Sequence, residues 1–302
     1  MASTTGHIPS VESARRGPIS AMVPTAPTPG TPAELYLDLM KRVLTRTLIA
    51  KTIERQTLQA RFPPKRLAVW LARGLLSPLS LELVRLIRCT PEDYLESGDA
   101  ACNRVEDAET MLGVRQLDNM QACIANVLRD GVPGDLLEAG VWRGGMTIFM
   151  RAALAAWGET SRTVWVADSF AGLPEPDHQQ DSFGWRAGDM AASLDEVRDN
   201  FARYGLLDER VRFLRGYFNS TLPSAPIKRL AILRIDADLY ESTLDVLNVL
   251  YPKLSPGGYA IFDDYRNLVD CRRAIDEYRA QHGIVEPVEL IDRRAVYWRK
   301  VA

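Results

Sequence analysis

The stretch that decides the fold spans residues 230–243 and reads Leu-Ala-Ile-Leu-Arg-Ile-Asp-Ala-Asp-Leu-Tyr-Glu-Ser-Thr. Its first six residues form a mostly apolar run with the length of a buried β-strand. Two acids, Asp236 and Asp238, follow at once, and a helical pattern begins after them. Because open α/β sheets bind ligands at the carboxyl ends of their strands, both acids are candidate site residues.

A second pair of acids ends another strand-like run. Residues 258–262 read Gly-Tyr-Ala-Ile-Phe and lead into Asp263 and Asp264. Four carboxylates at neighbouring strand ends would repel one another unless a cation lay between them. Carboxylate oxygens suit Mg²⁺, Mn²⁺ or Ca²⁺, so the two pairs together favour a metal site. The alternative is that some of these acids are helix caps or turn residues.

Strand-like runs alternate with helical patterns through the second half of the chain. Strands are expected at residues 135–140, 163–168, 211–216, 230–235 and 258–262, with a closing pair at 288–291 and 295–298. This alternation predicts an α/β fold with a mostly parallel, doubly wound sheet. We expect a disordered tail over residues 1–30, a helical cap and oligomerisation region over 31–130, and a cofactor-binding domain over 131–302.

The segment before the sheet is locally basic. Residues 41–88 contain eleven Lys or Arg against two acids, and residues 66–88 read as two amphipathic helices broken at Pro78. Such helices either cap the main domain or a second subunit, or lie on an anionic membrane or another partner.

Composition gives no sign of a nucleic-acid-binding or membrane-bound protein. The 302 residues are 46% hydrophobic and 25% charged, as in an ordinary globular protein, and the formal net charge of −2 favours neither nucleic acid nor membrane as a partner. Four cysteines without metal-ligand spacing are typical of reduced thiols, so we expect a cytoplasmic protein. Their positions are Cys89, Cys102, Cys123 and Cys271.

A glycine-containing loop after the first strand indicates a cofactor. It reads Glu138-x-Gly140-x-x-x-Gly144-Gly145, which departs from the G-x-G-x-x-G dinucleotide pattern. Asp168, at the end of the next strand, is placed to bind ribose hydroxyls. Together these features fit S-adenosylmethionine, with Glu138 facing its ammonium group. The alternatives are a solvated strand end for Glu138 and a turn with Ser169 for Asp168.

A metal and a methyl donor together predict O-methylation. A bound cation lowers the pKa of an acceptor hydroxyl, and a nearby carboxylate then takes the proton. If Asp236, Asp263 and Asp264 hold the ion, Asp238 is free to act as the base. The alternative is that Asp238 only caps the helix that begins near Tyr240.

Several blocks of sequence occur in an order that resembles the macrocin O-methyltransferase family, whose members methylate sugar hydroxyls of macrolide and aminocoumarin antibiotics. The matching blocks are residues 36–39, 109–113, 132–145, 164–174, 200–208, 234–243, 251–259 and 263–265. Three stretches differ from the family pattern. Residues 55–88 are longer than the usual helical cap, and residues 216–223 have Ser220 where the family pattern has an acid for adenine contacts. Residues 177–189 form an unusual loop that we expect to cover the acceptor.

The resemblance implies a Rossmann-like class I methyltransferase fold, S-adenosylmethionine, Mg²⁺ and a homo-oligomer. It assigns the metal to Asp236, Asp263 and Asp264, and the base to Asp238. Cofactor contacts are implied at Glu138, Gly140, Thr147, Asp168, Ser169 and Met111.

The expected acceptor is a sugar hydroxyl of a glycosylated natural product. A phenol, catechol or other polyketide hydroxyl is the alternative acceptor. A non-catalytic binding protein that uses residues 41–88 is the alternative from another class. Neither nucleic acid nor a membrane is expected as a partner.

Overall fold

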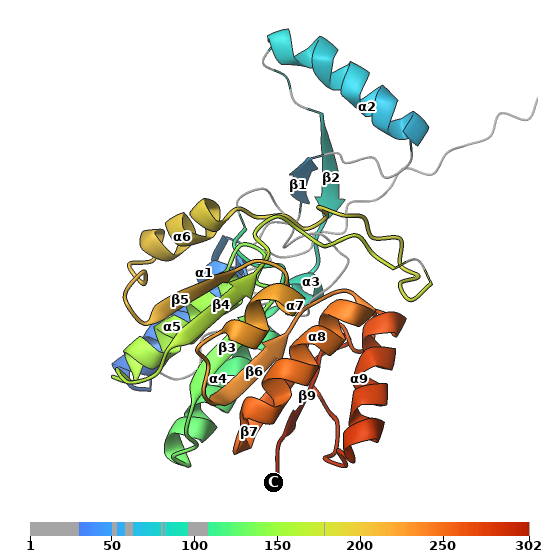
Figure 1. Cartoon of the computed structure of the whole chain (residues 1–302). Coiled ribbons are helices and arrows are strands. Elements are labelled where there is room, and N and C mark those ends of the chain that lie inside the picture. Colours follow the sequence, from blue (N-terminus) through green and yellow to red (C-terminus); the bar gives the residue numbers. More distant parts are fainter. Residues whose placement is uncertain are drawn as a thin grey trace, which may run out of the picture.

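The computed structural model describes residues 30–49, 53–57, 63–79, 81, 83–95, 108–177 and 179–301, so the tail expected over residues 1–30 lies almost wholly outside the described residues. The main sheet has seven strands in the order β5-β4-β3-β6-β7-β9-β8 (Figure 1). Their bounds are β3 Asp135–Ala139, β4 Val164–Asp168, β5 Val211–Arg215, β6 Leu230–Ile235, β7 Leu254–Phe262, β8 Glu289–Leu290 and β9 Val296–Arg299.

Neighbouring strands from β5 to β7 are parallel, whereas β9 runs antiparallel to β7 and to β8. The predicted mostly parallel, doubly wound sheet is therefore confirmed. The strand order reverses direction between β3 and β6, and such a switch point is where open α/β sheets bind ligands.

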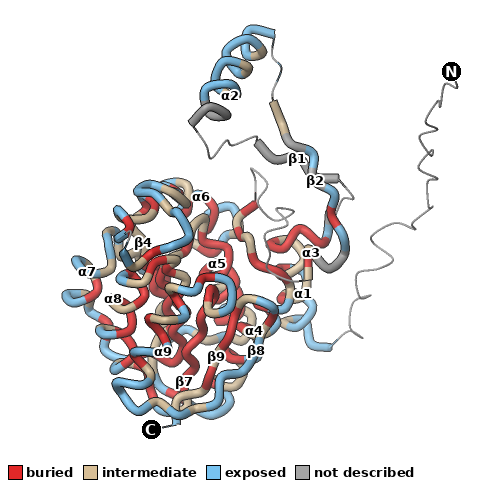
Figure 2. The backbone as a smooth tube through the Cα atoms, turned by 90° about the vertical axis from the view of Figure 1, so that its right-hand side faces the viewer, coloured by how far each residue is buried: buried red, intermediate tan, exposed pale blue. Residues whose placement is uncertain are grey.

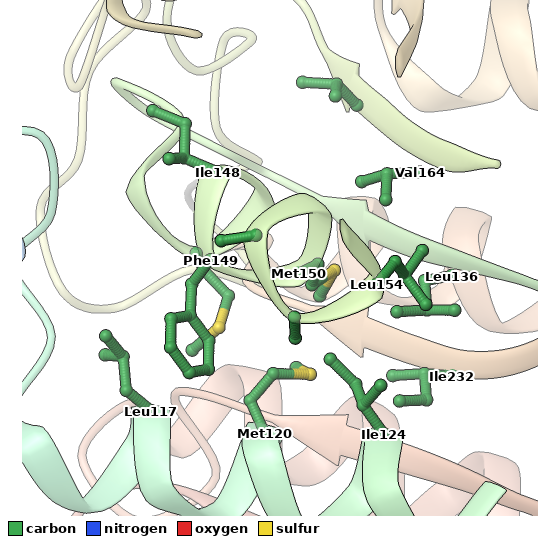
Figure 3. Packing of buried hydrophobic residues seen from close by; sticks show 14 of the residues in the cluster. Leu117, Met120, Ile124, Leu136, Ile148, Phe149, Met150, Leu154, Val164 and Ile232 are labelled. Atoms are coloured by element: carbon green, nitrogen blue, oxygen red, sulfur yellow. The ribbon is translucent and has the colours of Figure 1, made fainter. Parts of the chain in front are cut away.

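Helices cover both faces of the sheet. One core contains residues of α1 Pro32–Leu44, α4 Val114–Arg129, α5 Gly145–Ala156 and α6 Leu194–Arg203; the other contains residues of α8 Tyr240–Leu250 and α9 Val269–His282. Side chains alternate between the two cores along each strand, as Ile232 and Leu233 do on β6. Figure 3 shows α4 packed against α5 and the sheet through Leu117, Met120 and Ile124. The helices α1 and α4 therefore share a core with the strands.

A separate two-stranded unit lies outside this body. The strands β1 Ile53–Thr57 and β2 Val84–Arg88 pair antiparallel, with α2 Pro63–Leu76 between them. Figure 2 shows α2 standing away from the body, with most of its described surface exposed. The helix predicted over residues 79–88 is wrong at its carboxyl half, because the alternating residues of β2 find a strand partner about thirty positions earlier in the chain.

The remaining short elements are α3 Pro91–Leu95 and α7 Phe218–Thr221, with 3₁₀ turns at Thr47–Ile49, Ser77–Leu79, Leu222–Ser224 and Tyr251–Lys253. Within the described ranges, no helix combines the length and the apolar character needed to cross a membrane. Cys123 and Cys271 are buried free thiols, but Cys89 is disulfide-bonded, so the expectation of reduced thiols is wrong at Cys89.

Candidate active site

Gly140 brings the ends of β3 and β6 together. Its φ of 85° lies in the left-handed region, and a Cβ added there would lie 1.7 Å from the carbonyl oxygen of Asp236. Only glycine allows this approach, because any side chain would collide with the backbone of the neighbouring strand end. The glycine that the sequence assigned to the cofactor loop therefore joins that loop to the first acid pair.

Asp168 accepts hydrogen bonds both from the cofactor loop that follows β3 and from the turn that follows its own strand, β4. Its Oδ2 accepts a hydrogen bond from the Val141 amide at 2.8 Å, and its Oδ1 accepts one from the Phe170 amide at 2.8 Å. The alternative of a turn residue is thus partly correct, yet the carboxylate also borders the pocket described next. Burial raises the pKa of Asp168 despite these amide donors. The Ser169 hydroxyl donates to the Gly172 carbonyl at 2.6 Å.

One pocket joins the cofactor loop to the acids at the end of β6. Its volume is about 810 Å³, including the part open to solvent, which suits a small-molecule site. The lining residues are Met111, Gly140, Trp142, Asp168, Ser169, Gly172, Leu173, Pro174, Met190, Tyr217, Phe218, Asn219, Asp236, Ala237, Asp238, Ser242 and Asp245. Four of the six expected cofactor residues therefore share one cavity with Asp236 and Asp238.

Glu138 and Thr147, the other two expected cofactor residues, do not line this pocket. The hydroxyl of Thr147 is buried and donates to the Gly144 carbonyl at 2.8 Å. Glu138 is 2% exposed, so it is not a solvated strand end. Its Oε1 instead lies 2.5 Å from Nη1 of Arg234.

Three carboxylates gather beside the pocket. One oxygen from each of Asp236, Asp238 and Asp264 lies within 4.8 Å of the others, a spacing that a single cation can bridge. Oδ1 of Asp264 lies 3.2 Å from the Arg294 guanidinium, while its buried Oδ2 has no hydrogen-bond partner among the described residues. Burial, followed by the charge of neighbouring carboxylates, raises the pKa of Asp238 and of Asp264.

Asp263 lies outside this group. Its Oδ1 is 2.6 Å from Nη2 of Arg234, and its side chain is buried. Burial and the neighbouring Asp236 carboxylate raise the pKa of Asp263 to about 6. Asp263 thus neighbours Asp236 but turns an oxygen to Arg234, whereas Asp238 is the residue that shares the 4.8 Å grouping with Asp236 and Asp264.

Asp238 does not cap the helix that follows it. The first amide of α8, on Tyr240, donates instead to Oδ1 of Asp181 at 2.8 Å. Asp181 belongs to the loop expected over the acceptor, and this contact fastens that loop to α8. Asp238 itself has a φ of 59°, a left-handed conformation that Asp tolerates better than most residues. Its carboxylate is therefore left to face the pocket.

The charges at this centre do not balance. Five carboxylates, on Glu138, Asp236, Asp238, Asp263 and Asp264, meet two guanidinium groups, on Arg234 and Arg294. Ionisation of all five acids would leave a formal excess of three negative charges, which a hard divalent cation would offset. The unpaired oxygen of Asp264 and the all-oxygen ligand set also fit such a cation.

Sequence patterns did not single out Arg234, Asp181 or Trp142. Arg234 lies within an apolar strand run, which gave no signal that it would be the ionic partner of three acids. The contact of Asp181 with α8 joins positions 59 residues apart. Trp142 lines the pocket and has a φ of 47°. The only sequence signal for this role is its position beside the glycines of the cofactor loop.

Comparison with known proteins shows which enzymes this chain resembles in sequence and fold. Residues 33–300 match the family described as Macrocin-O-methyltransferase (TylF). The chain is 44% identical over 284 residues to the mycinamicin III 3''-O-methyltransferase of Micromonospora griseorubida, covering 91% of this chain and all of that one. It is 54% identical over 201 residues to 8-demethyl-8-(2,3-dimethoxy-alpha-L-rhamnosyl)-tetracenomycin-C 4'-O-methyltransferase of Streptomyces olivaceus, covering 65% of this chain and 77% of that one.

Among solved structures, the O-methyltransferase NovP superposes with a TM-score of 0.70 at 41% identity, covering 89% of this chain and all of that one. The family match spans both strand-end acid pairs, the cofactor loop and the helices that pack on the sheet. The chain therefore belongs to the macrocin O-methyltransferase family, and it is a methyltransferase for which the family implies S-adenosylmethionine as the methyl donor.

Proposed function

We propose that this enzyme transfers the methyl group of S-adenosylmethionine to a sugar hydroxyl of a glycosylated natural product, with the help of Mg²⁺. The observation that carries the proposal is the single pocket that borders both the cofactor loop, at Gly140 and Asp168, and the acids Asp236 and Asp238. A donor held by the loop and an acceptor held at the acids would meet within that pocket.

The names of the relatives support a sugar acceptor. The Micromonospora enzyme is a mycinamicin III 3''-O-methyltransferase, and the name of the Streptomyces olivaceus enzyme describes a rhamnosyl tetracenomycin. A demethyldecarbamoylnovobiocin O-methyltransferase of Streptomyces niveus is 43% identical over 293 residues, covering 93% of this chain and 99% of that one. A phenolic, catechol or other polyketide hydroxyl is the alternative acceptor.

For the ion we propose Asp236, Asp263 and Asp264 as ligands and Asp238 as the base. The unpaired Oδ2 of Asp264 and the excess of negative charge support a cation at this place. The observed grouping offers an alternative set, in which Asp238 replaces Asp263 beside Asp236 and Asp264. Cation binding by single variants separates the two sets, as argued in the Discussion.

The chain's own residues then account for the chemistry. A bound Mg²⁺ would lower the pKa of the acceptor hydroxyl and help to hold its oxygen in place. Asp238, whose pKa burial raises, takes the hydroxyl proton. The new bond joins the acceptor oxygen to the methyl carbon, the carbon–sulfur bond breaks, and sulfur keeps its electron pair as S-adenosylhomocysteine leaves. Asp168 orients the ribose, and Met111 and Trp142 help to exclude water from the pocket.

We further propose a cytoplasmic homo-oligomer without nucleic acid or membrane partners. The buried free thiols of Cys123 and Cys271 suit a reducing compartment, although the disulfide at Cys89 does not. The apolar side of α2 supports association with a second copy, because Leu67, Trp70, Leu71 and Leu75 are all more than half exposed.

The test is methyl transfer from S-adenosylmethionine to a panel of acceptors, followed by mass spectrometry of the products. The panel pairs each glycosylated macrolide, aminocoumarin and tetracenomycin with its aglycone, and adds simple catechols. Methylation of glycosides but not of aglycones, lost with excess chelator, supports the proposal. Methylation of aglycones or catechols alone would favour the phenolic alternative, and chelator-resistant turnover would remove the metal.

A further inference from the structure

Arg234 is the ionic centre of the site. Its Nη1 lies 2.5 Å from Oε1 of Glu138 and 2.9 Å from Oδ2 of Asp236, and its Nη2 lies 2.6 Å from Oδ1 of Asp263. The Gln116 amide oxygen accepts a further hydrogen bond from Nη2 at 3.1 Å. The arginine side chain is completely buried, so the carboxylates rather than water satisfy its charge.

These contacts use one oxygen of each neighbouring aspartate. Arg234 contacts Oδ2 of Asp236 and Oδ1 of Asp263. The other oxygen of each aspartate makes no contact with the guanidinium. The planar fork of an arginine fixes its partners in direction as well as in distance. A cation bound through both oxygens of either aspartate would share one of them with the buried guanidinium, so two positive charges would lie close together; binding through the other oxygen alone avoids this repulsion.

The number of oxygens that each carboxylate offers distinguishes the two common hard cations. Ca²⁺ takes six to eight oxygens and often binds a carboxylate through both. Mg²⁺ takes six in near-octahedral geometry, keeps several waters, and binds carboxylates through single oxygens. A site whose carboxylates are each held to one oxygen is thus matched to Mg²⁺.

We infer that Arg234 is a positioning residue that limits Asp236 and Asp263 to one coordinating oxygen each and thereby selects Mg²⁺ over Ca²⁺. This inference rests on the proposed metal site. It concerns Asp236 in either of the two ligand sets, because Asp236 belongs to both. Arg234 also connects the metal-binding acids to Glu138 on β3, so the orientation of the acids depends on a strand that carries the cofactor loop.

The inference is tested by calorimetric titration of Mg²⁺ and of Ca²⁺, separately and without substrates, into the wild-type protein and Arg234→Lys. Lysine keeps the charge but replaces the fork with one ammonium group. Loss of a group that orients metal ligands costs about 10- to 100-fold in affinity, so Mg²⁺ binding should weaken by that factor. Ca²⁺ binding should weaken less, which moves the ratio of the two dissociation constants toward Ca²⁺ by about tenfold.

Arg151→Lys is the matched control. Arg151 forms a forked ion pair with Asp208, with Nη2 2.5 Å from Oδ2, and neither residue belongs to the pocket. This variant should leave the ratio of the Mg²⁺ and Ca²⁺ dissociation constants unchanged. An unchanged ratio in Arg234→Lys, with wild-type Mg²⁺ binding intact, overturns the inference and leaves the proposed function standing. Absence of any cation binding to the wild-type protein overturns the proposed metal site itself.

A second measurement needs no variant and therefore does not depend on the folding of Arg234→Lys. Mn²⁺ titrated into the wild-type protein reports its bound waters through magnetic relaxation. Three carboxylates that each give one oxygen leave about three of six positions for water. About three waters support the inference, whereas one or none indicates carboxylates bound through both oxygens and overturns it.

Discussion

Glu138 and Arg234 are paired residues on the adjacent parallel strands β3 and β6, and their side chains form a buried ion pair with Oε1 2.5 Å from Nη1. Burial raises the pKa of Glu138 to about 8, and the Arg234 charge only partly opposes this rise. The pair links the strand that leads into the cofactor loop to the strand that ends in Asp236.

Removing one member of this pair should destabilise the fold. We expect Glu138→Ala to lower the free energy of unfolding by about 3 kcal/mol, since the buried Nη1 of Arg234 loses a charged hydrogen-bond partner that no water replaces. Urea unfolding followed by circular dichroism measures the change. Asp118→Ala, which breaks the more exposed pair with Lys41, should cost less than about 1 kcal/mol. Equal losses in the two variants would contradict a special role for the Glu138 pair.

The close approach at Gly140 predicts a difference between two glycine substitutions. Gly140→Ala should weaken S-adenosylmethionine binding at least tenfold, because its Cβ would collide with the Asp236 carbonyl oxygen. Gly158→Ala is the control: its φ of 68° is also left-handed, but nothing lies within 4 Å of the added carbon. It should cost only about 1 kcal/mol of stability and leave donor binding intact. Wild-type affinity of Gly140→Ala for S-adenosylmethionine would contradict this prediction, because it would show that the cofactor loop can move away from the Asp236 carbonyl.

The roles of Asp238 and Asp263 can be separated by measuring binding and turnover together. If Asp263 is a ligand and Asp238 the base, Asp263→Asn should weaken Mg²⁺ binding about 10- to 100-fold. Asp238→Asn should retain Mg²⁺ binding and lose about 10²- to 10⁴-fold in kcat. Loss of Mg²⁺ binding in Asp238→Asn, with binding retained in Asp263→Asn, would instead select the ligand set Asp236, Asp238 and Asp264 that the structure groups.

The Arg151–Asp208 pair predicts a pH dependence of stability. The hydrogen bond from Arg151 holds the pKa of Asp208 below its usual value. A depressed pKa in the folded state contributes stability that is present above the unfolded pKa of about 3.9 and is lost as pH falls through the lower folded value. Asp208→Asn should therefore lower the melting temperature at pH 7, and its difference from wild type should vanish in acid. A difference that is constant down to pH 2 would contradict this linkage.

The exposed side of α2 predicts an effect on assembly. The double variant Leu71→Ser and Leu75→Ser should lower the mass measured by light scattering from an oligomer toward a monomer. Val285→Ser, at a residue that is 88% exposed and distant in sequence from α2, should leave the mass unchanged. A double variant with wild-type mass would place the oligomer interface elsewhere.

Much of the sheet could be predicted because its signals are local. Most strands of the parallel core are short, largely apolar runs, and acids or glycines follow them within a few residues. No helix was predicted over the residues of α9, since its buried residues Cys271, Ala274, Ile275 and Tyr278 stand among many charged ones. The strand β2 was predicted as helix because its partner β1 lies far away in the sequence.

The sequence by itself determined the parallel sheet, the glycine turn at Gly140 and the placing of four acids at two strand ends, because these depend on neighbouring residues. Only the tertiary structure decided that Arg234 would hold Glu138, Asp236 and Asp263, and that Asp181 rather than Asp238 would cap α8. Those contacts join side chains from separate strands and loops. Their strength comes from burial away from water, a property that exists only once the chain has folded.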